Sequence, residues 1–243
     1  MNFVGMMAGH RCKMSGKNVG GSSKQGIKGE TMSEVQMQEI TCPKCGKKHS
    51  FSVWDSINVM EHPDMREKVR NDEAFRFQCP DCGASALLNY NFLYHDPEEK
   101  IFIFCNAEQT ACDEIRRVLT DENNAFKNYT KRIVPSYNAF KEKLMIFDAR
   151  LDDKLLEIMK SGIFANLEAH YKDKNIDEVL FAVNEDGEKG FIMRSNGVMQ
   201  AGMEFDESLY NALKEKAEET VALFSPTDVE IDTAWAREII ERL

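Results

Sequence analysis

The chain has 243 residues, of which 42% are hydrophobic and 30% charged, as expected of a soluble globular protein with one or two domains. Its net charge of −10 argues against a non-specific nucleic-acid binder, and no apolar run approaches the roughly 20 residues that span a bilayer. Four of its seven cysteines form two close pairs. This indicates metal or redox chemistry in a reducing, cytoplasmic compartment rather than a secreted disulfide framework.

Residues 1–31 differ in composition from the rest of the chain. They contain seven of the 14 glycines and five basic residues against one acidic residue, and Gly20-Gly21-Ser22-Ser23 is typical of a flexible linker. We therefore expect an unstructured tail. The codons for Lys28-Gly29-Glu30 can contain a GGAG sequence just before Met32, so a mis-assigned start is a second interpretation. A basic arm for an acidic partner is a third.

Residues 36–130 are expected to form a zinc-ribbon-like antiparallel β unit with a helical insertion. Short apolar runs bounded by turn residues predict its strands. His62-Pro63-Asp64 predicts the start of the inserted helix, because proline is favoured in a first helical turn. The expected strands are 35–41, 50–53, 74–78, 86–94 and 101–105, and the expected helices are 63–70 and 111–120.

Residues 131–243 are expected to form an α+β region of helices and a small antiparallel β-meander, so the fold class is α+β. Asp186-Gly187 and Asn196-Gly197 are hairpin signals. Gly162 is a candidate break in a long helix, and Asp232 or Thr233 is a candidate cap of the last helix. The expected helices are 136–148, 151–171, 206–224 and a C-terminal one, and the expected strands are 179–183, 191–193 and 198–203.

The predicted metal ligands are Cys42, Cys45, Cys79 and Cys82. Each pair belongs to a Cys-Pro-x-Cys-Gly motif, in which one tight turn can present both sulfurs to a single ion. The glycine can adopt a positive φ, and the proline stiffens the turn. Two facing turns make a tetrahedral site of four sulfurs, which selects Zn²⁺ or iron. We expect a structural Zn²⁺ site, with a rubredoxin-like iron centre as the minority alternative.

The motif leaves other interpretations open. The pairs are separated by 33 residues, more than the about 15–20 of a compact four-cysteine site, so the helix between them is an insertion. A pair at a helix N-terminus would indicate thiol–disulfide chemistry, although neither pair precedes an expected helix. His49 could replace a thiolate. The cations expected to offset the charge of the site are Lys44, Lys47, Lys48 and Arg76.

An aromatic stripe follows the expected strand 86–94 and continues on its partner strand. Such a face could stack bases, but few basic residues interleave with it, so a core face is the better interpretation. The stripe consists of Leu88, Tyr90, Phe92, Tyr94, Phe102 and Phe104. Cys105 is expected in the core and Cys112 near a helix start. The histidines expected at the surface are His62, His95 and His170.

Residues 38–160 resemble the bacterial CpXC domain family, which is named for its paired Cys-Pro-x-Cys motifs. The resemblance rests on both cysteine motifs and on the stretches Arg132–Asn138 and Lys143–Asp148. It implies that the four cysteines act together in a bacterial, cytosolic protein. The family implies no activity, so no catalytic residue is carried over.

We therefore expect a cytosolic protein with a structural four-cysteine zinc site that acts through contacts with other proteins. No nucleic-acid or membrane partner is expected. Three alternatives stay open: an enzyme with its active site in residues 131–243, a nucleic-acid-binding zinc ribbon, and a thiol–disulfide redox protein. The chain has no phosphate-binding Gly-rich loop and no Gly-x-Ser-x-Gly elbow, so no catalytic residue is predicted.

Overall fold

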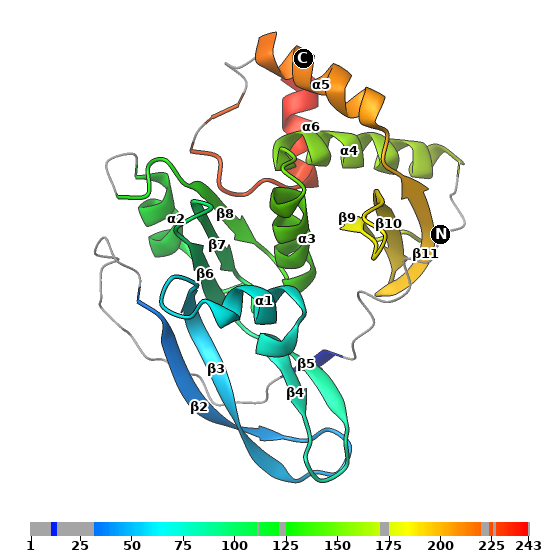
Figure 1. Cartoon of the computed structure of the whole chain (residues 1–243). Helices are drawn as coiled ribbons and strands as arrows, with labels where there is room; N and C mark the ends of the chain where they lie inside the picture. The colour runs from blue at the N-terminus through cyan, green and yellow to red at the C-terminus, as the bar shows by residue number, and fades with distance from the viewer. Residues whose placement is uncertain are drawn as a thin grey trace. The chain divides into compact units, whose positions relative to one another are not determined.

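The computed structural model describes residues 11–13, 32–110, 112–121, 125–170, 175–219, 224–225 and 227–242 (Figure 1). The chain divides into two compact units, one ending at Tyr137 and the other beginning at Asn138. We call them the cysteine unit and the C-terminal unit. Apart from Arg11–Lys13, the expected tail of residues 1–31 lies outside the described residues, so its interpretations stay predictions. Among the helices described, none is long and apolar enough to cross a membrane.

The described part of the cysteine unit consists of strands, two short helices and one 3₁₀ turn. The strands are β1 (Arg11–Lys13), β2 (Glu34–Thr41), β3 (Lys48–Asn58), β4 (Arg76–Gln78), β5 (Ser85–Asn89), β6 (Phe92–Asp96), β7 (Ile101–Cys105) and β8 (Thr130–Val134). The helical elements are α1 (Asp64–Arg70), η1 (Glu73–Phe75) and α2 (Asp113–Thr120). The sequence does not predict strand β8, because Lys131 and Arg132 are charged residues that are nevertheless buried.

The larger sheet of this unit has the order β2-β3-β6-β7-β8 and is mixed. The β2–β3 and β6–β7 pairs are antiparallel, whereas the β3–β6 and β7–β8 pairs are parallel. Parallel neighbours need a crossover connection, and the segments that contain α1 and α2 are these two crossovers. The α+β class and the helical insertion are confirmed, but the expectation of a purely antiparallel unit is wrong.

The smaller sheet has the order β1-β5-β4 and includes the second cysteine hairpin. The run 86–94, expected to be one strand, is therefore two strands in two sheets. Tyr90 lies at the change of sheet, is 4% exposed and accepts a hydrogen bond of 3.4 Å from the Trp54 N–H of β3. Because Tyr90 is buried, the alternation of buried and less buried side chains continues from β5 into β6, although Tyr90 itself belongs to neither strand.

Five of the six residues of the aromatic stripe are buried and Phe104 is half-buried, but the part of the stripe on β6 and β7 occupies both faces of the larger sheet. The β6–β7 register pairs Tyr94 with Ile103, so Phe102 points to the opposite face from Tyr94. On one face, Arg70 of α1 donates a hydrogen bond of 3.2 Å to the Tyr94 hydroxyl. On the other, the ring of Phe126 lies 5.0 Å from that of Phe102. Both faces of the sheet are therefore covered at β6 and β7.

His95 is a core residue and not the surface residue that the sequence analysis expected. Its side chain is 5% exposed, and its ring lies 5.4 Å from the rings of Phe102 and Phe126 and 5.5 Å from that of Tyr129. Burial among these rings lowers the pKa of His95. Strand β6 is covered on both faces, so no alternation marked this histidine as internal.

The C-terminal unit has the helices and the meander that the sequence predicts. Its helices are α3 (Tyr137–Asp148, which begins at the last residue of the cysteine unit), α4 (Asp153–His170), α5 (Glu207–Glu219) and α6 (Thr233–Arg242). The antiparallel sheet β11-β10-β9 consists of β9 (Glu178–Val183), β10 (Lys189–Ser195) and β11 (Val198–Glu204). Asp232 caps α6 by accepting a hydrogen bond of 2.9 Å from the Trp235 N–H. Helix α4 contacts β9, α5 and α6.

Helices α3 and α4 bury a group of charged side chains between them. Lys143 lies 2.9 Å from Asp153 and 3.1 Å from Glu157. Lys160 lies 3.0 Å from both Glu142 and Glu157. All five are at most 5% exposed. Each of these side chains has a partner of opposite charge inside the unit, with three carboxylates sharing two ammonium groups, and all are shielded from solvent.

The lowered pKa of His95 predicts a pH-dependent loss of stability. As the pH falls through about 6.5, the unfolded chain takes up a proton that the folded chain excludes, so folding becomes less favourable. His95→Phe keeps an aromatic ring and removes the titration. We expect the wild type to lose stability relative to this variant between about pH 7.5 and pH 5.5, by up to about 1.4 kcal/mol per pH unit. Urea unfolding at several pH values measures it, and identical pH profiles would contradict it.

Candidate metal centre

The first cysteine pair lies in the turn between β2 and β3. The Cys42 N–H donates a hydrogen bond of 2.8 Å to the Lys47 carbonyl, and the Gly46 N–H donates one of 2.9 Å to the Cys42 carbonyl. Gly46 has a φ of +72°, a conformation that other residues adopt only with strain. The antiparallel β2–β3 ladder closes next to this turn, with Thr41 opposite Lys48. The local sequence therefore forms a compact knuckle.

The second pair repeats this geometry in the turn between β4 and β5. The Cys79 N–H donates a hydrogen bond of 2.8 Å to the Ala84 carbonyl, and the Gly83 N–H donates one of 2.9 Å to the Cys79 carbonyl. Gly83 has a φ of +68°. The motif thus dictates its own backbone, since it folds in the same way in two different sheets.

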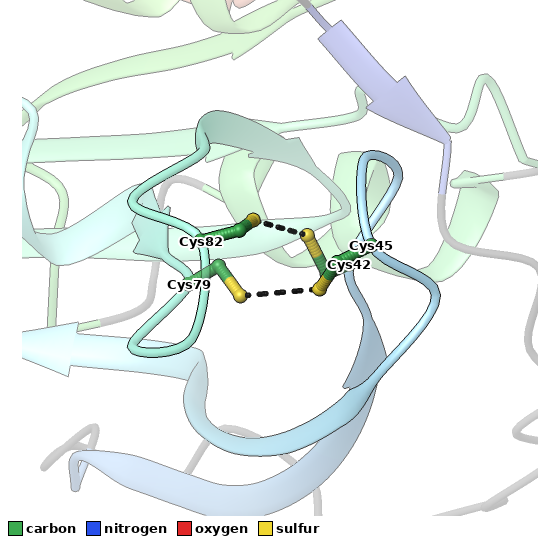
Figure 2. Close-up of side chains that lie close together, drawn as sticks. All are labelled: Cys42, Cys45, Cys79 and Cys82. Atoms are coloured by element: carbon green, nitrogen blue, oxygen red, sulfur yellow. Dashed lines mark hydrogen bonds between the residues drawn. The ribbon is translucent and has the colours of Figure 1, made fainter.

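The two knuckles face each other and bring all four sulfurs together (Figure 2). The Sγ atoms lie 3.6 Å apart for Cys42 and Cys82 and 3.7 Å apart for Cys45 and Cys79, and all four lie within 4.8 Å of one another. Sulfurs held tetrahedrally at about 2.3 Å from one ion lie about 3.8 Å apart, whereas a disulfide needs about 2.05 Å. The predicted residues therefore converge at a spacing suited to a shared metal ion.

The thiols lie so close that they change one another's acidity. The backbone N–H of Cys45 lowers the pKa of Cys42 to about 6. The backbone N–H of Lys47 lowers the pKa of Cys45, but desolvation of its sulfur within the cluster and the neighbouring thiols outweigh it and raise that pKa to about 12. The Ala84 N–H lowers the pKa of Cys82, but desolvation and the thiols of Cys79 and Cys42 outweigh it, so the net effect is a raised pKa. Four thiolates can share this space only with a cation between them.

The cluster is shielded unevenly. Cys42 and Cys79 are each 1% exposed, Cys82 is half-buried, and Cys45 is exposed. The first cysteine of each motif therefore lies inward and the second lies outward.

Asp81 links the two knuckles beside the sulfurs. Its carboxylate lies 2.6 Å from Lys47 Nζ and 3.0 Å from His49 Nε2. His49 Nε2 also lies 3.4 Å from Cys79 Sγ, so His49, Cys79 and Asp81 form a second group of ligand atoms next to the first. His49 was weighed from the sequence as a substitute ligand. Asp81 was missed, although it is the variable residue of the second Cys-Pro-x-Cys motif.

Three of the four basic residues expected to offset the charge of the cluster pair with acidic side chains, and the fourth, Lys44, is exposed. Lys47 pairs with Asp81, Lys48 lies 2.6 Å from Glu39, and Arg76 lies 3.4 Å from Asp72. Closeness in sequence thus identified only Lys47 as a cation bound within the knuckles.

An aromatic contact fixes the hairpins behind the cluster. The ring of Phe77 on β4 lies 6.2 Å from that of Phe51 on β3, edge to face, and 6.0 Å from that of His49. Phe77 is 2% exposed. This contact joins two hairpins that share no backbone ladder. No local pattern in the sequence predicts it.

Residues 40–160 match the family described as CpXC protein, which confirms the resemblance inferred from the motifs. The match includes both knuckles and continues through α3 into α4. No curated protein and no solved structure matches the chain.

The positive φ of the knuckle glycines predicts a specific order among substitutions. A Cβ at Gly46 or Gly83 meets no atom within 4 Å, so the cost of alanine comes from the backbone alone. We expect Gly46→Ala and Gly83→Ala each to lower the free energy of unfolding by about 1 kcal/mol. Gly46→Asn should cost less, because asparagine tolerates this conformation better. Chemical unfolding with excess zinc measures the order, and equal losses for alanine and asparagine would contradict it.

Proposed function

We propose that this chain, which carries a CpXC region over residues 40–160, is a cytosolic bacterial protein with one structural Zn²⁺ ion, and that it acts through contacts with other proteins. The proposed ligands are Cys42, Cys45, Cys79 and Cys82. The observation that carries the proposal is the convergence of their four Sγ atoms within 4.8 Å. Bound Zn²⁺ would supply the positive charge that the four thiolates need.

A structural role is supported by the completeness of the ligand set. Four sulfurs satisfy a tetrahedral ion and leave no coordination position for substrate or water. The ligands also come from two hairpins in different sheets, so an ion held by all four joins parts of the unit that no backbone ladder connects. We choose zinc over iron because zinc has no redox chemistry. A zinc site therefore needs no protection from solvent at the exposed Cys45.

The alternatives receive less support from the same observations. Both Cys-Pro-x-Cys turns lead into strands, whereas thiol–disulfide centres use a helix N-terminus to stabilise the thiolate. Five of the six residues of the aromatic stripe are buried, so it offers no platform for bases. The ionised side chains between α3 and α4 are paired and at most 5% exposed, which argues against an active site there.

An interaction role is supported by apolar side chains that face solvent. Met203 on β11 is 39% exposed, Leu209 on α5 is 47% exposed and Ile240 on α6 is 42% exposed, and all three line one groove. Clustered apolar exposure of this kind usually marks a binding surface. The C-terminal unit therefore offers a surface for a protein partner.

The metal proposal predicts one zinc ion per chain and its loss on single substitution. Changing any of the four ligands to serine should abolish stoichiometric zinc and unfold the cysteine unit, because the binding free energy of such a site is folding free energy. Cys112→Ser is the matched control. Cys112 is the N-cap of α2, a position at which serine is favoured, so this variant should keep both zinc and stability. Elemental analysis and circular dichroism report the two properties.

Two results would contradict the metal proposal. One is a metal-free protein that unfolds at the same temperature as the zinc-loaded protein. The other is full zinc content in every ligand variant. Iron with visible absorption from thiolate-to-iron charge transfer would support the four-sulfur site but overturn the choice of zinc.

The nucleic-acid alternative has its own test. A binder needs several Lys or Arg residues on one face, and its affinity falls steeply with salt. Lys47, Lys48 and Arg76 are engaged with acidic side chains, so we expect no sub-micromolar binding of duplex DNA or single-stranded RNA at physiological salt. Fluorescence anisotropy measures it, and tight, salt-sensitive binding would overturn this expectation.

A further inference from the structure

The C-terminal unit contains an open groove with a volume of about 850 Å³. One wall is a continuous stripe of α4 from Ile158 to Leu167, and the other walls are residues of β10, β11, α5 and α6. The volume lies within the range of known ligand sites. All of the elements that form the groove belong to this one unit.

The groove is apolar and adaptable. Three methionines line it, Met159, Met193 and Met203. Methionine side chains are flexible and polarizable, and they are frequent at surfaces that accept varied apolar partners. At the rim, Met203 is 39% exposed, Leu209 47% and Ile240 42%. These side chains would gain apolar contacts if the groove were filled.

Gly162 keeps the groove open. Its low helix propensity predicts a possible helix break, but α4 continues through Gly162 to His170. A Cβ built at Gly162 meets no atom within 4 Å, so neither helix packing nor backbone conformation requires glycine here. Glycine in a helix interior lowers stability relative to alanine. Its benefit at this position is the space that it leaves in the groove.

The polar side of the groove is acidic. Glu204 at the end of β11 and Asp206 before α5 line it, and both are exposed. Residues 138–243 contain 23 acidic and 13 basic residues, a net charge of −10, whereas residues 1–137 contain 18 of each. The groove therefore lies in the part of the chain that carries the whole net negative charge.

We propose that this groove binds an amphipathic helix of a partner protein, with the apolar face of that helix inside and its Lys or Arg side chains beside Glu204 and Asp206. The inference deepens the interaction role of the proposed function. The α4 stripe spans nine residue steps, or about 14 Å, which matches anchors at i, i+4 and i+7 of a docked helix. Carboxylates at the apolar groove select for basic flanking residues.

The test uses the full-length, zinc-loaded chain and a labelled peptide of about 16 residues, built from leucine and lysine in amphipathic helical order. A peptide of the same pattern with glutamate in place of lysine is the charge control. We expect fluorescence anisotropy to show binding of the lysine peptide that weakens with salt. The glutamate peptide should bind at least about tenfold more weakly.

Two pairs of variants locate the binding site. Gly162→Leu fills the groove, and Ala165→Leu adds the same side chain on an exposed position of α4. Gly162→Leu should weaken peptide binding at least about tenfold, and Ala165→Leu should not change it. Glu204→Gln with Asp206→Asn should reduce both the affinity and its salt dependence, while Glu185→Gln in the β9–β10 turn should have no effect. Asparagine at position 206 keeps the oxygen that accepts the Leu209 N–H.

Other outcomes would overturn the proposal. Equal binding of the peptide by Gly162→Leu and wild type would exclude the groove. Binding of laurate or dodecylamine without binding of the peptide would make the occupant a small amphiphile. Self-association of the wild type, lost in Gly162→Leu on sedimentation, would make the occupant a second copy of the chain. Zinc content measured on every variant separates these failures from failure of the metal proposal.

Discussion

The arrangement of the cysteine unit depends on one constraint, the meeting of two knuckles that belong to different sheets. The β2–β3 hairpin is at the edge of the five-stranded sheet, and the β4–β5 hairpin lies in the smaller one. Between the pairs, the inserted segment forms α1 and η1 and supplies the cover of one face of the larger sheet. Fixing the knuckles together closes this segment as a loop and removes most of the conformational freedom of its ends. The meeting of the knuckles and the coverage of the core are thus coupled.

The parts of the fold that sequence reasoning anticipated are those governed by local chemistry. The knuckles follow from Cys-Pro-x-Cys-Gly because each forms its hydrogen bonds within six residues. The helices of the C-terminal unit follow from their apolar periodicity. The parts that it missed depend on distant partners: β8 is a strand because it lies beside β7, and His95 is internal because Phe126 and Tyr129 cover it. Lys47 and Asp81 belong to different knuckles, so their ion pair forms only when the knuckles meet and neither motif alone predicts it.

The two edges of the sheet in the C-terminal unit differ in the side chains that lie beside them. At the β9 edge, the buried carboxylate of Glu142 accepts a hydrogen bond of 2.6 Å from the Phe181 N–H and pairs with Lys160. Part of the buried charge network therefore satisfies backbone at a strand edge. The β11 edge carries exposed Val198 and Met203 and contributes to the groove. One edge is closed by polar contacts within the unit, and the other presents apolar side chains to solvent.

The sequence separation of the two knuckles also has a consequence during synthesis. Cys82 follows Cys45 by 37 residues, so at about 5–20 residues per second the ribosome adds it roughly 2–7 s later. During that interval the nascent chain presents two thiols without the other two. A hairpin of the β2–β3 kind forms within microseconds, so the first knuckle can be complete before its partner exists. At this half-formed stage the two thiols lack the shielding that the second knuckle later gives them, so they are more open to oxidation.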